Sequence, residues 1–257
     1  MTAGRLAVVG LGPGASAWRT PEASERLAGA TDLVGYGRYL QMVGDLEPPP
    51  VRHEFDNREE AERARFALDL AAGGRDVVVV SSGDPGVFAM ATAVVEELHR
   101  AGPGRYDTVE LTIVPGLTAA SAAAARVGAP LGHDFCCISL SDVLKPWSVV
   151  EQRLEAVGAA DFVVALYNPR SSHRPWQLGR AIEILRGHRA PATPVVLARS
   201  VGRVGEETQV TTLEAVDPDL VDMRTVVIVG STTTRAFRDE RDRTWVYTAR
   251  SYAPELA

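Results

Sequence analysis

The chain has 257 residues, of which 46% are hydrophobic and 23% are charged, a composition that excludes a disordered protein and indicates a large buried core. At roughly 150 residues per domain, this length predicts one large domain or two smaller ones. The net charge is −6, and Lys145 is the one lysine among 27 basic residues. Such an acidic chain excludes a surface built throughout for nucleic acid, and arginine is the main cation for binding carboxylates or phosphates.

Cys136 and Cys137 are the two cysteines of the chain and are neighbours in the apolar run 135–140. Adjacent strand side chains point to opposite faces of a sheet, so a disulfide between them would be strained, and we expect two buried, reduced thiols. The apolar run that begins at Leu6 lacks the pattern of a signal peptide, and no run approaches the length of a membrane span. The sequence therefore predicts a soluble, cytoplasmic protein that binds no membrane, and without clustered Cys and His it predicts no metal site.

Short β-branched runs alternate with amphipathic stretches, a pattern typical of βα units around a parallel sheet. We expect strands at 6–10, 77–81, 111–114, 162–167, 195–199 and 226–230, and helices at 59–72, 88–100, 119–127 and 176–187. After residue 199 the alternation weakens, and the runs 208–213 and 225–230 are expected to be antiparallel strands of a mixed sheet. With a boundary near Pro115, the sequence predicts a mainly parallel α/β domain at 1–114 and a mixed α/β domain at 115–257.

The first expected strand runs into the loop Gly-Leu-Gly-Pro-Gly-Ala at residues 10–15, which matches the G-x-G-x-x-A pattern of dinucleotide-binding loops. Two features oppose that function. Pro13 removes a backbone N–H from the loop that would hold a pyrophosphate. Asp32 precedes the next apolar stretch, whereas an acidic residue that binds a ribose follows it. We therefore expect a loop that lines a ligand site without being a dinucleotide fingerprint.

Two further expected strands also end in glycine-bearing loops, Ser-Gly-Asp-Pro-Gly at 82–86 and Pro-Gly-Leu-Thr at 115–118. Thr118 is expected to cap the alanine-rich helix that follows it. Each loop alone is an ordinary turn, but the carboxyl ends of parallel strands meet at one edge of a sheet, where open α/β sheets bind ligands. The three loops together therefore predict a ligand site, to which Asp84 contributes a carboxylate.

These three loops resemble the signature loops of the tetrapyrrole methylases, enzymes that use S-adenosylmethionine, and the resemblance covers nearly the whole chain. Further stretches are similar to the branch of that family that methylates carbon 17 of precorrin-3B, namely residues 132–135, 139–147, 166–171 and 229–231. The resemblance implies two α/β domains, the first with a mainly parallel sheet and the second with a mixed sheet. It also implies an active cleft between them and a homodimer.

By this resemblance, nine residues are expected to line the S-adenosylmethionine site: Pro13, Gly83, Asp84, Val87, Thr118, Ala119, Asn168, Ser200 and Thr225. Many relatives have a methionine where this chain has Asn168. Relatives that methylate uroporphyrinogen tend to have an acidic residue after the tyrosine that is followed here by Gly37. No acid or base role is therefore carried over to that position.

The implied reaction moves the sulfonium methyl to carbon 17 of precorrin-3B and contracts the macrocycle, giving precorrin-4 and S-adenosylhomocysteine. In-line positioning can supply roughly 7–11 kcal/mol of such a barrier, and no covalent enzyme nucleophile is needed. Ring contraction also needs a base for the hydroxyl proton on the expelled carbon. The candidate bases are His133, Asp142 and Asp84, and Lys145 is the candidate for a cation that orients them. The structural alternatives are a turn for His133, a helix cap or loop carboxylate for Asp142 and a solvated side chain for Lys145.

The implied substrate is a tetrapyrrole with many carboxylates, which arginines bind as bidentate pairs. The expected substrate-binding residues are one glycine of the first loop and several arginines in or beside glycine-, proline- or serine-containing loops: Gly12, Arg38, Arg170, Arg174, Arg203 and Arg235. For each arginine alone, an ordinary surface position is the alternative.

Three other functions stay open. A methylase of the same architecture that acts at a different ring position, or on the cobalt-containing intermediate cobalt-factor III, would be recognised by its activity on metal-free and cobalt-loaded substrates. A nicotinamide-dependent oxidoreductase would bind NADH, and the position of Asp32 opposes it. A non-catalytic tetrapyrrole carrier would bind the macrocycle without S-adenosylmethionine.

Overall fold

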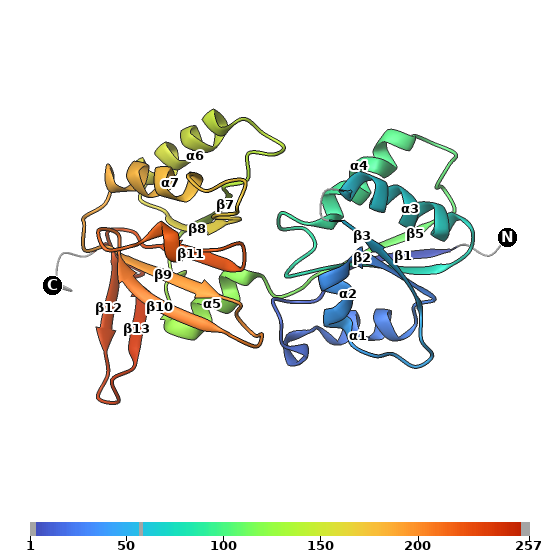
Figure 1. Cartoon of the computed structure of the whole chain (residues 1–257), viewed down its shortest axis with the longest axis horizontal. Coiled ribbons are helices and arrows are strands. Elements are labelled where there is room, and N and C mark those ends of the chain that lie inside the picture. Colours follow the sequence, from blue (N-terminus) through green and yellow to red (C-terminus); the bar gives the residue numbers. More distant parts are fainter. Residues whose placement is uncertain (1–3, 57–58, 253–257) are drawn as a thin grey trace. The chain divides into compact units, whose positions relative to one another are not determined.

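The computed structural model describes residues 4–56 and 59–252. The chain divides into two compact units, unit 1 at residues 1–118 and unit 2 at residues 119–257 (Figure 1). Unit 1 is built on a parallel sheet and unit 2 on a mixed sheet. The predicted α/β class, with these two kinds of sheet, is confirmed.

Unit 1 contains five parallel strands in the order β3-β2-β4-β1-β5. Their bounds are β1 Arg5–Gly10, β2 Asp32–Tyr36, β3 Val51–Phe55, β4 Asp76–Ser81 and β5 Glu110–Val114. Strand β4 is a continuous run of buried valines over residues 77–80, because helices cover both faces of the sheet. All five strands run in one direction, so their carboxyl ends share one edge.

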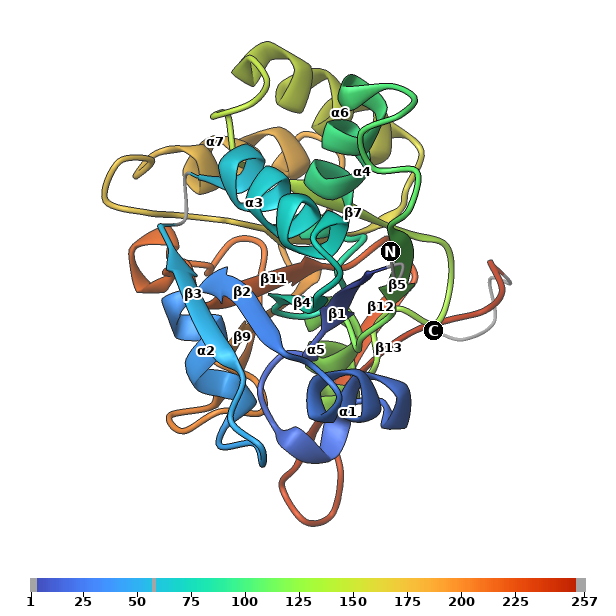
Figure 2. The same ribbon diagram turned by 90° about the vertical axis from the view of Figure 1, so that its right-hand side faces the viewer.

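The helices of the described part of unit 1 pack in pairs on the two faces of the sheet (Figure 2). One face carries α1 (Pro21–Ala28) and α2 (Gly37–Val43), and the other carries α3 (Glu60–Ala72) and α4 (Met90–Ala101). A short 3-10 helix, η1 (Ser16–Trp18), precedes α1. The pairs enclose separate hydrophobic clusters, so the sheet is the middle layer of three.

Unit 2 contains a five-stranded mixed sheet in the order β10-β9-β11-β8-β7. Its strands are β7 Phe135–Ser139, β8 Val163–Tyr167, β9 Pro194–Arg199, β10 Glu207–Thr212 and β11 Thr225–Val229. Strand β7 is parallel to β8, whereas β11 is antiparallel to both β8 and β9 and β10 is antiparallel to β9. The predicted antiparallel strands after residue 199 are thereby confirmed. A smaller sheet joins β6 (Gly128–Ala129), β12 (Thr234–Arg238) and β13 (Thr244–Thr248).

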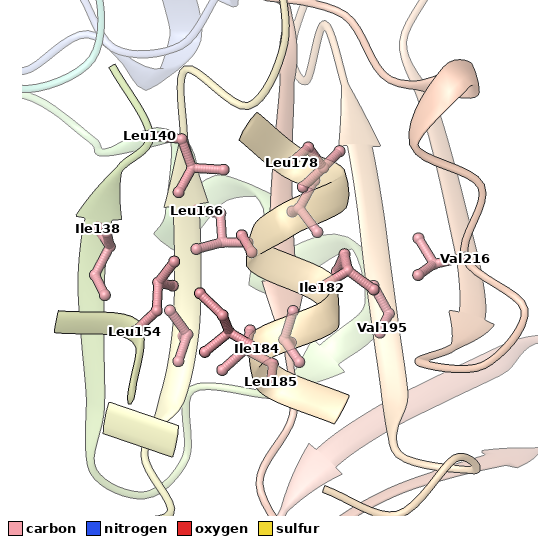
Figure 3. Close-up of a cluster of buried hydrophobic side chains, with 14 of the residues drawn as sticks. Ile138, Leu140, Leu154, Leu166, Leu178, Ile182, Ile184, Leu185, Val195 and Val216 are labelled. Atoms are coloured by element: carbon pink, nitrogen blue, oxygen red, sulfur yellow. The ribbon is translucent and has the colours of Figure 1, made fainter. Parts of the chain in front are cut away.

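The core of unit 2 lies between its main sheet and the helices α6 (Trp147–Ala159) and α7 (Gln177–Arg186). Leu178, Ile182 and Leu185 of α7 face the sheet residues Ile138 and Leu166 across this core (Figure 3). The alanine-rich helix α5 (Ala119–Val127) packs by β11, and η2 (Pro218–Leu220) is a short 3-10 turn. Among the described residues, no helix has the length and apolar character that crossing a bilayer requires.

Two of the sequence-based expectations about local structure are corrected here. The helix expected from residue 88 begins at Met90, because Phe88 has a left-handed backbone with φ 55° and Ala89 is extended. Cys136 and Cys137 are free thiols, but they are half-buried rather than buried, because β7 is an edge strand. Burial still raises the pKa of the Cys136 thiol to about 11.

Candidate active site

The three glycine-bearing loops of unit 1 lie together at the carboxyl ends of β1, β4 and β5. Gly12 N donates to Gly83 O at 3.1 Å and Gly83 N donates to Gly12 O at 2.8 Å, which joins the first two loops. A Cβ at Gly10 would lie 2.7 Å from Gly83 O and 2.8 Å from Gly116 N, so a larger residue does not fit between the loops. The predicted meeting of the loops at one edge is confirmed. The bridge occupies the N–H and C=O of Gly12, so this residue shapes the loop rather than offering its N–H to a substrate.

Asp84 holds the second and third loops together. Its Oδ1 accepts a hydrogen bond from Gly86 N at 2.8 Å, and its Oδ2 accepts one from Gly116 N at 3.0 Å. Each oxygen keeps a further lone pair, so the carboxylate can also accept a hydrogen bond from a ligand hydroxyl or ammonium. Asp84 is therefore a structural residue with remaining acceptor capacity, and it is poorly suited to act as a free base.

The dinucleotide-binding alternative is opposed by the backbone of the first loop. Leu11 N donates to Ser81 O at 2.8 Å, and Gly12 N is used in the bridge to the second loop. Pro13 has no N–H at all. Three amide positions of this loop are thus consumed within the fold or lack an N–H, which leaves fewer donors for a pyrophosphate.

Asp32 also serves the fold. It begins β2, is 2% exposed, accepts hydrogen bonds from Arg75 Nε at 2.8 Å and Thr31 Oγ1 at 2.7 Å, and lies 2.9 Å from His53 Nε2. Burial raises the pKa of its carboxyl, but these hydrogen bonds outweigh burial and hold the pKa below its usual range. Asp32 lies at the amino end of β2, opposite the edge with the glycine loops, as predicted from the sequence.

Two charged residues, Glu54 and Arg38, lie beside the carboxyl end of β2, at the same edge of the unit 1 sheet as the glycine loops. A Cβ at Gly37, the first residue of α2, would lie 1.8 Å from Glu54 Oε1, so the Glu54 carboxylate fills the space that a side chain there would need. Arg38 follows and is exposed, and its guanidinium has no partner within the described part of the chain. Glu54 was missed by sequence reasoning because strand β3, which carries it, has no clear apolar alternation.

Unit 2 gathers a second set of site residues at one edge of its main sheet. Strands β7, β8 and β9 end there and the antiparallel β11 begins there, so Asn168, Ser200 and Thr225 share this edge. Asn168 and Ser200 have left-handed backbones, with φ 51° and 50°, a conformation that non-glycine residues adopt rarely and that clusters at ligand sites. Thr225 is 4% exposed, and its hydroxyl donates to Asp222 Oδ1 at 3.1 Å.

Hydrogen bonds tie the loops of this second edge to one another. Asn168 Nδ2 donates to Ser139 Oγ at 2.9 Å, which links the ends of β7 and β8. Ala120 N donates to the Tyr167 hydroxyl at 3.0 Å, which brings the first turn of α5, and with it Ala119, to the end of β8. Ser139 and Tyr167 were not expected as site residues, although each ends an expected or implied strand.

The nine residues expected to line the S-adenosylmethionine site are distributed over both edges. Unit 1 carries Pro13, Gly83, Asp84, Val87 and Thr118, and unit 2 carries Ala119, Asn168, Ser200 and Thr225. Four of the nine residues are buried, namely Pro13, Gly83, Ser200 and Thr225, and the other five are half-buried. The half-buried members are the ones whose side chains are accessible to a ligand.

Asp142 and Lys145 lie in the loop between β7 and α6, at the same edge as Asn168. Gln177 Nε2 donates to Asp142 Oδ2 at 3.0 Å, which orients the carboxylate. Burial and the nearby Arg153 lower the pKa of Lys145, and the negative charge of Asp142 opposes that shift. The loop thus carries one oriented carboxylate and one partly desolvated cation.

His133 lies away from this edge. It precedes β7, whereas Asp142 follows it, and five strand residues at ~3.3 Å each separate them by roughly 16 Å. His133 Nδ1 accepts a hydrogen bond from Asp134 N at 2.7 Å, and its ring packs edge-on against Tyr252 at 5.3 Å. These contacts favour the turn that was the structural alternative, so we leave His133 out of the candidate site.

Three of the expected substrate arginines, Arg170, Arg174 and Arg235, bind groups of the protein itself instead of offering free guanidinium groups. Arg174 is 9% exposed and donates to Asn168 O at 2.9 Å, and burial lowers its pKa. Arg170 pairs with Asp219 at 2.7 Å. Arg235 lies on β12 and donates to a backbone carbonyl at 2.8 Å. Their side chains are engaged because a guanidinium satisfies several acceptors at once.

Arg38 and Arg203 are the remaining expected substrate arginines. Arg38 lies at the site edge of unit 1, and Arg203 lies at the site edge of unit 2. Arg203 is half-buried in the turn after β9, where its N donates to Ser200 O at 2.9 Å.

A depression of about 510 Å³ in unit 1 lies at the other end of the sheet, lined by the paired Arg5 and Asp76 and by charged residues of α1. It contains none of the expected site residues. Within the described ranges, no three His, Cys, Asp or Glu side chains gather as metal ligands would.

The chain belongs to the tetrapyrrole (corrin/porphyrin) methylases, because the model of that family matches residues 5–217. The class defined by the fold and the loops is thus a methyltransferase. The chain is 50% identical over 250 residues to the precorrin-3B C(17)-methyltransferase of Sinorhizobium sp, an alignment that covers 97% of this chain and 98% of that protein. It is 51% identical over 254 residues to the cobalamin biosynthesis protein CobIJ of Mycobacterium bovis, and covers 48% of that protein's length.

A probable cobalt-factor III C(17)-methyltransferase of Salmonella typhimurium is 44% identical over 229 residues, which cover 89% of this chain and 93% of that protein. Among solved structures, the crystal structure of the methyltransferase CobJ is 49% identical with a TM-score of 0.89 over 96% of this chain and 100% of that chain. These similarities agree with the family assignment and with the fold of each unit.

Proposed function

We propose that this chain transfers the methyl group of S-adenosylmethionine to carbon 17 of precorrin-3B and contracts the macrocycle to precorrin-4, within cobalamin biosynthesis. The observation that carries the proposal is the 50% identity to the precorrin-3B C(17)-methyltransferase of Sinorhizobium sp over nearly the full length of both proteins. The 49% identity to CobJ, with a TM-score of 0.89, supports it.

The residues of the two edges fit S-adenosylmethionine, which supplies an electrophilic methyl group on a sulfonium. The remaining lone pairs of Asp84 suit ribose hydroxyls or an ammonium group. Residues of both units are proposed to hold the cosubstrate: Pro13, Gly83, Asp84, Val87, Thr118, Ala119, Asn168, Ser200 and Thr225. Their contribution is positioning, because methyl transfer needs alignment and no covalent protein nucleophile.

Asp142 is proposed as the base that removes the hydroxyl proton during ring contraction. Gln177 occupies one of its oxygens, and the other keeps its lone pairs for a proton. Lys145 lies in the same loop and is proposed to stabilise the negative charge of Asp142 and of the substrate. An oriented carboxylate beside a single cation suits proton transfer better than the amide-bound Asp84.

Arg38 and Arg203 are proposed to bind carboxylates of the tetrapyrrole. Arg38 is exposed without a partner among the described residues, so its guanidinium can form a bidentate pair without breaking an existing one. Arg170 is the weaker candidate because a carboxylate of the substrate would have to compete with Asp219.

The same methylation on cobalt-factor III is the second candidate, favoured by the 44% identity to the Salmonella typhimurium protein. The proposal also includes a homodimer in the cytoplasm.

The test is to incubate the purified protein with S-adenosylmethionine and precorrin-3B, with each omitted in turn, and to follow mass and absorption spectra. A product one methyl group heavier, with the chromophore of a contracted ring, is expected. A parallel incubation with cobalt-factor III separates the two candidates by their kcat/KM. Binding of S-adenosylhomocysteine without methylation of either substrate would contradict the substrate assignment and leave the family assignment intact.

A further inference from the structure

The carboxylate of Glu54 lies against the backbone of Gly37. Glu54 is the fourth residue of β3, and Gly37 is the first residue of α2. A Cβ on Gly37 would lie 1.8 Å from Glu54 Oε1 and 2.4 Å from Glu54 Cδ. The carboxyl group therefore occupies the place of a side chain at position 37, and glycine there permits this close approach.

The strand register places Glu54 at the edge that carries the glycine loops. Glu54 pairs with Gly35 of β2, and the preceding β2 residue, Val34, pairs with Val79 of β4. Glu54 is thus level with the last residues of β4, which lead into the second glycine loop. Two strand spacings of ~4.8 Å separate β3 from β4, so this carboxylate starts roughly 10 Å from that loop.

The fold of unit 1 uses other charged groups and leaves this carboxylate unused. Arg52, on the same face of β3, donates to Leu40 O of α2 at 2.9 Å. Asp32 and Asp76 at the other end of the sheet each pair with an arginine. Glu54 is exposed, and within residues 4–56 and 59–252 its carboxylate accepts no hydrogen bond and forms no ion pair. Its acceptor capacity is available to a ligand.

The charge of Glu54 limits what part of the substrate it can bind. An ionised carboxylate accepts hydrogen bonds and donates none, and it repels the carboxylates of a tetrapyrrole. The exposed Arg38, which follows Gly37 directly, is the group at this edge that suits those carboxylates. The donors that suit Glu54 are the N–H groups at the centre of a metal-free macrocycle. In a cobalt complex the same nitrogens bind the metal and carry no hydrogen.

We propose that Glu54 accepts hydrogen bonds from the central N–H groups of the tetrapyrrole and thereby favours the metal-free substrate over the cobalt-loaded one. Gly37 sets the position of the carboxylate. This inference rests on the proposed function for the class of substrate. Glu54 is a binding and specificity residue, and neither the methyl transfer nor the loss of the hydroxyl proton passes through it.

The first test is Glu54→Ala, assayed on both substrates. We expect kcat/KM for precorrin-3B to fall about tenfold because charge-assisted hydrogen bonds are lost. The value for cobalt-factor III and the affinity for S-adenosylhomocysteine should stay unchanged. The matched control is Glu25→Ala, an exposed glutamate of α1 at the other end of the sheet, which should behave as the wild type.

Three results of this test would overturn the inference. An equal loss on both substrates would mean that the carboxylate does not distinguish N–H groups from a metal. A loss confined to cobalt-factor III would mean that it binds the metal. A lower thermal midpoint at unchanged kcat/KM would mean that Glu54 serves α2 alone.

The second test moves the carboxylate from position 54 to position 37. A Cβ at 37 falls on the place of Glu54 Oε1, and the carboxyl carbon of an aspartate lies ~1.5 Å beyond its Cβ. Gly37→Asp in the Glu54→Ala background is therefore expected to restore kcat/KM for precorrin-3B to within about threefold of the wild type. Gly37→Ala in the same background is the control and should restore nothing. Equal activity of the two double variants would contradict the position assigned to the carboxylate.

Equilibrium binding gives a readout that needs no turnover. The probes are uroporphyrinogen III under anaerobic conditions, whose pyrroles carry N–H groups, and copper uroporphyrin III, whose nitrogens bind the metal. Glu54→Ala is expected to weaken binding of the first about tenfold and to leave the second unchanged. If the wild type methylates neither tetrapyrrole yet shows this difference, the proposed function fails and the inference holds. If Glu54→Ala binds both probes as the wild type does, the inference is overturned.

Discussion

Many arginines of this chain hold its own carbonyls and carboxylates, and this limits which of them can bind a ligand. Arg189 shows the principle in unit 2, where its guanidinium donates to Gly158 O at 2.7 Å and Phe162 O at 3.0 Å. Arg174 does the same beside the site. Since a guanidinium presents five N–H donors in one plane, a buried arginine can join several loops. Arg38, which is exposed and has no partner among the described residues, is therefore the stronger candidate for binding substrate carboxylates.

Arg38→Ala is expected to raise the KM for precorrin-3B about tenfold, equivalent to ~1.4 kcal/mol of lost binding free energy, because a charge-assisted pair with a substrate carboxylate is lost. Affinity for S-adenosylhomocysteine should not change. Steady-state kinetics and calorimetry measure the two quantities. Arg26→Ala, in the last turn of α1 at the other end of the sheet, is the matched control, and an equal effect of the two variants would remove Arg38 from the site.

Asp32 is expected to make stability depend on pH in the acid range. The pKa of its carboxyl is held below its usual range by Arg75, His53 and Thr31, so its contribution is present above the unfolded pKa of about 3.9 and is lost as pH falls below it. Asp32→Asn should lower the free energy of unfolding by about 2 kcal/mol at pH 7. Urea unfolding at several pH values should show the two proteins converging below about pH 4. A constant difference down to pH 2.5 would contradict this account.

At the scale of elements, the site edge of unit 1 is formed by loops that pack backbone against backbone. A Cβ at Gly116 would lie 2.3 Å from Gly83 O and 3.0 Å from Gly10 Cα. Because backbone atoms of fixed strands cannot move aside cheaply, the three loops require glycine for their contact. The ligand edge is thus a property of three elements together.

Gly116→Ala is expected to lower the free energy of unfolding by about 2 kcal/mol through overpacking and to weaken S-adenosylhomocysteine binding at least tenfold. Thermal unfolding and calorimetry test both. The matched control is Gly179→Ala in α7, where a Cβ meets nothing within 4 Å; it should stabilise the chain by roughly 0.5–1 kcal/mol because alanine favours a helix. Wild-type affinity in Gly116→Ala would show that the loop contact is not needed for the ligand.

At the scale of the whole molecule, the cosubstrate is expected to stabilise the native chain, because it binds the folded form alone. At a concentration one hundred times Kd, S-adenosylhomocysteine should add about 2.7 kcal/mol. For a chain of this size that corresponds to a rise in the thermal midpoint of roughly 5–10 °C. NADH at the same concentration is the control and should give no shift. A shift with NADH alone would favour the oxidoreductase alternative and contradict the family assignment of the site.

The sequence by itself determined the fold class and the glycine loops, because both depend on short-range patterns. The valine run of β4 and the periodic helices α3 and α7 are readable without a structure, since a strand buried on both faces must be apolar throughout. The sequence also showed that Asp32 does not fit the dinucleotide-binding pattern. Its place before an apolar stretch put it at the amino end of β2, whereas an acidic residue that binds a ribose follows the strand. The family resemblance added the substrate class.

Only the tertiary structure decided which side chains are available for chemistry. The pairing of Arg170 with Asp219, the approach of Glu54 to Gly37 and the bond from Gln177 to Asp142 each depend on partners distant in sequence. A side chain is available to a ligand only after the acceptors and donors of its own fold have been satisfied. Which side chains bind groups of the protein itself depends on the folded arrangement, so the spacing of residues along the chain cannot show it.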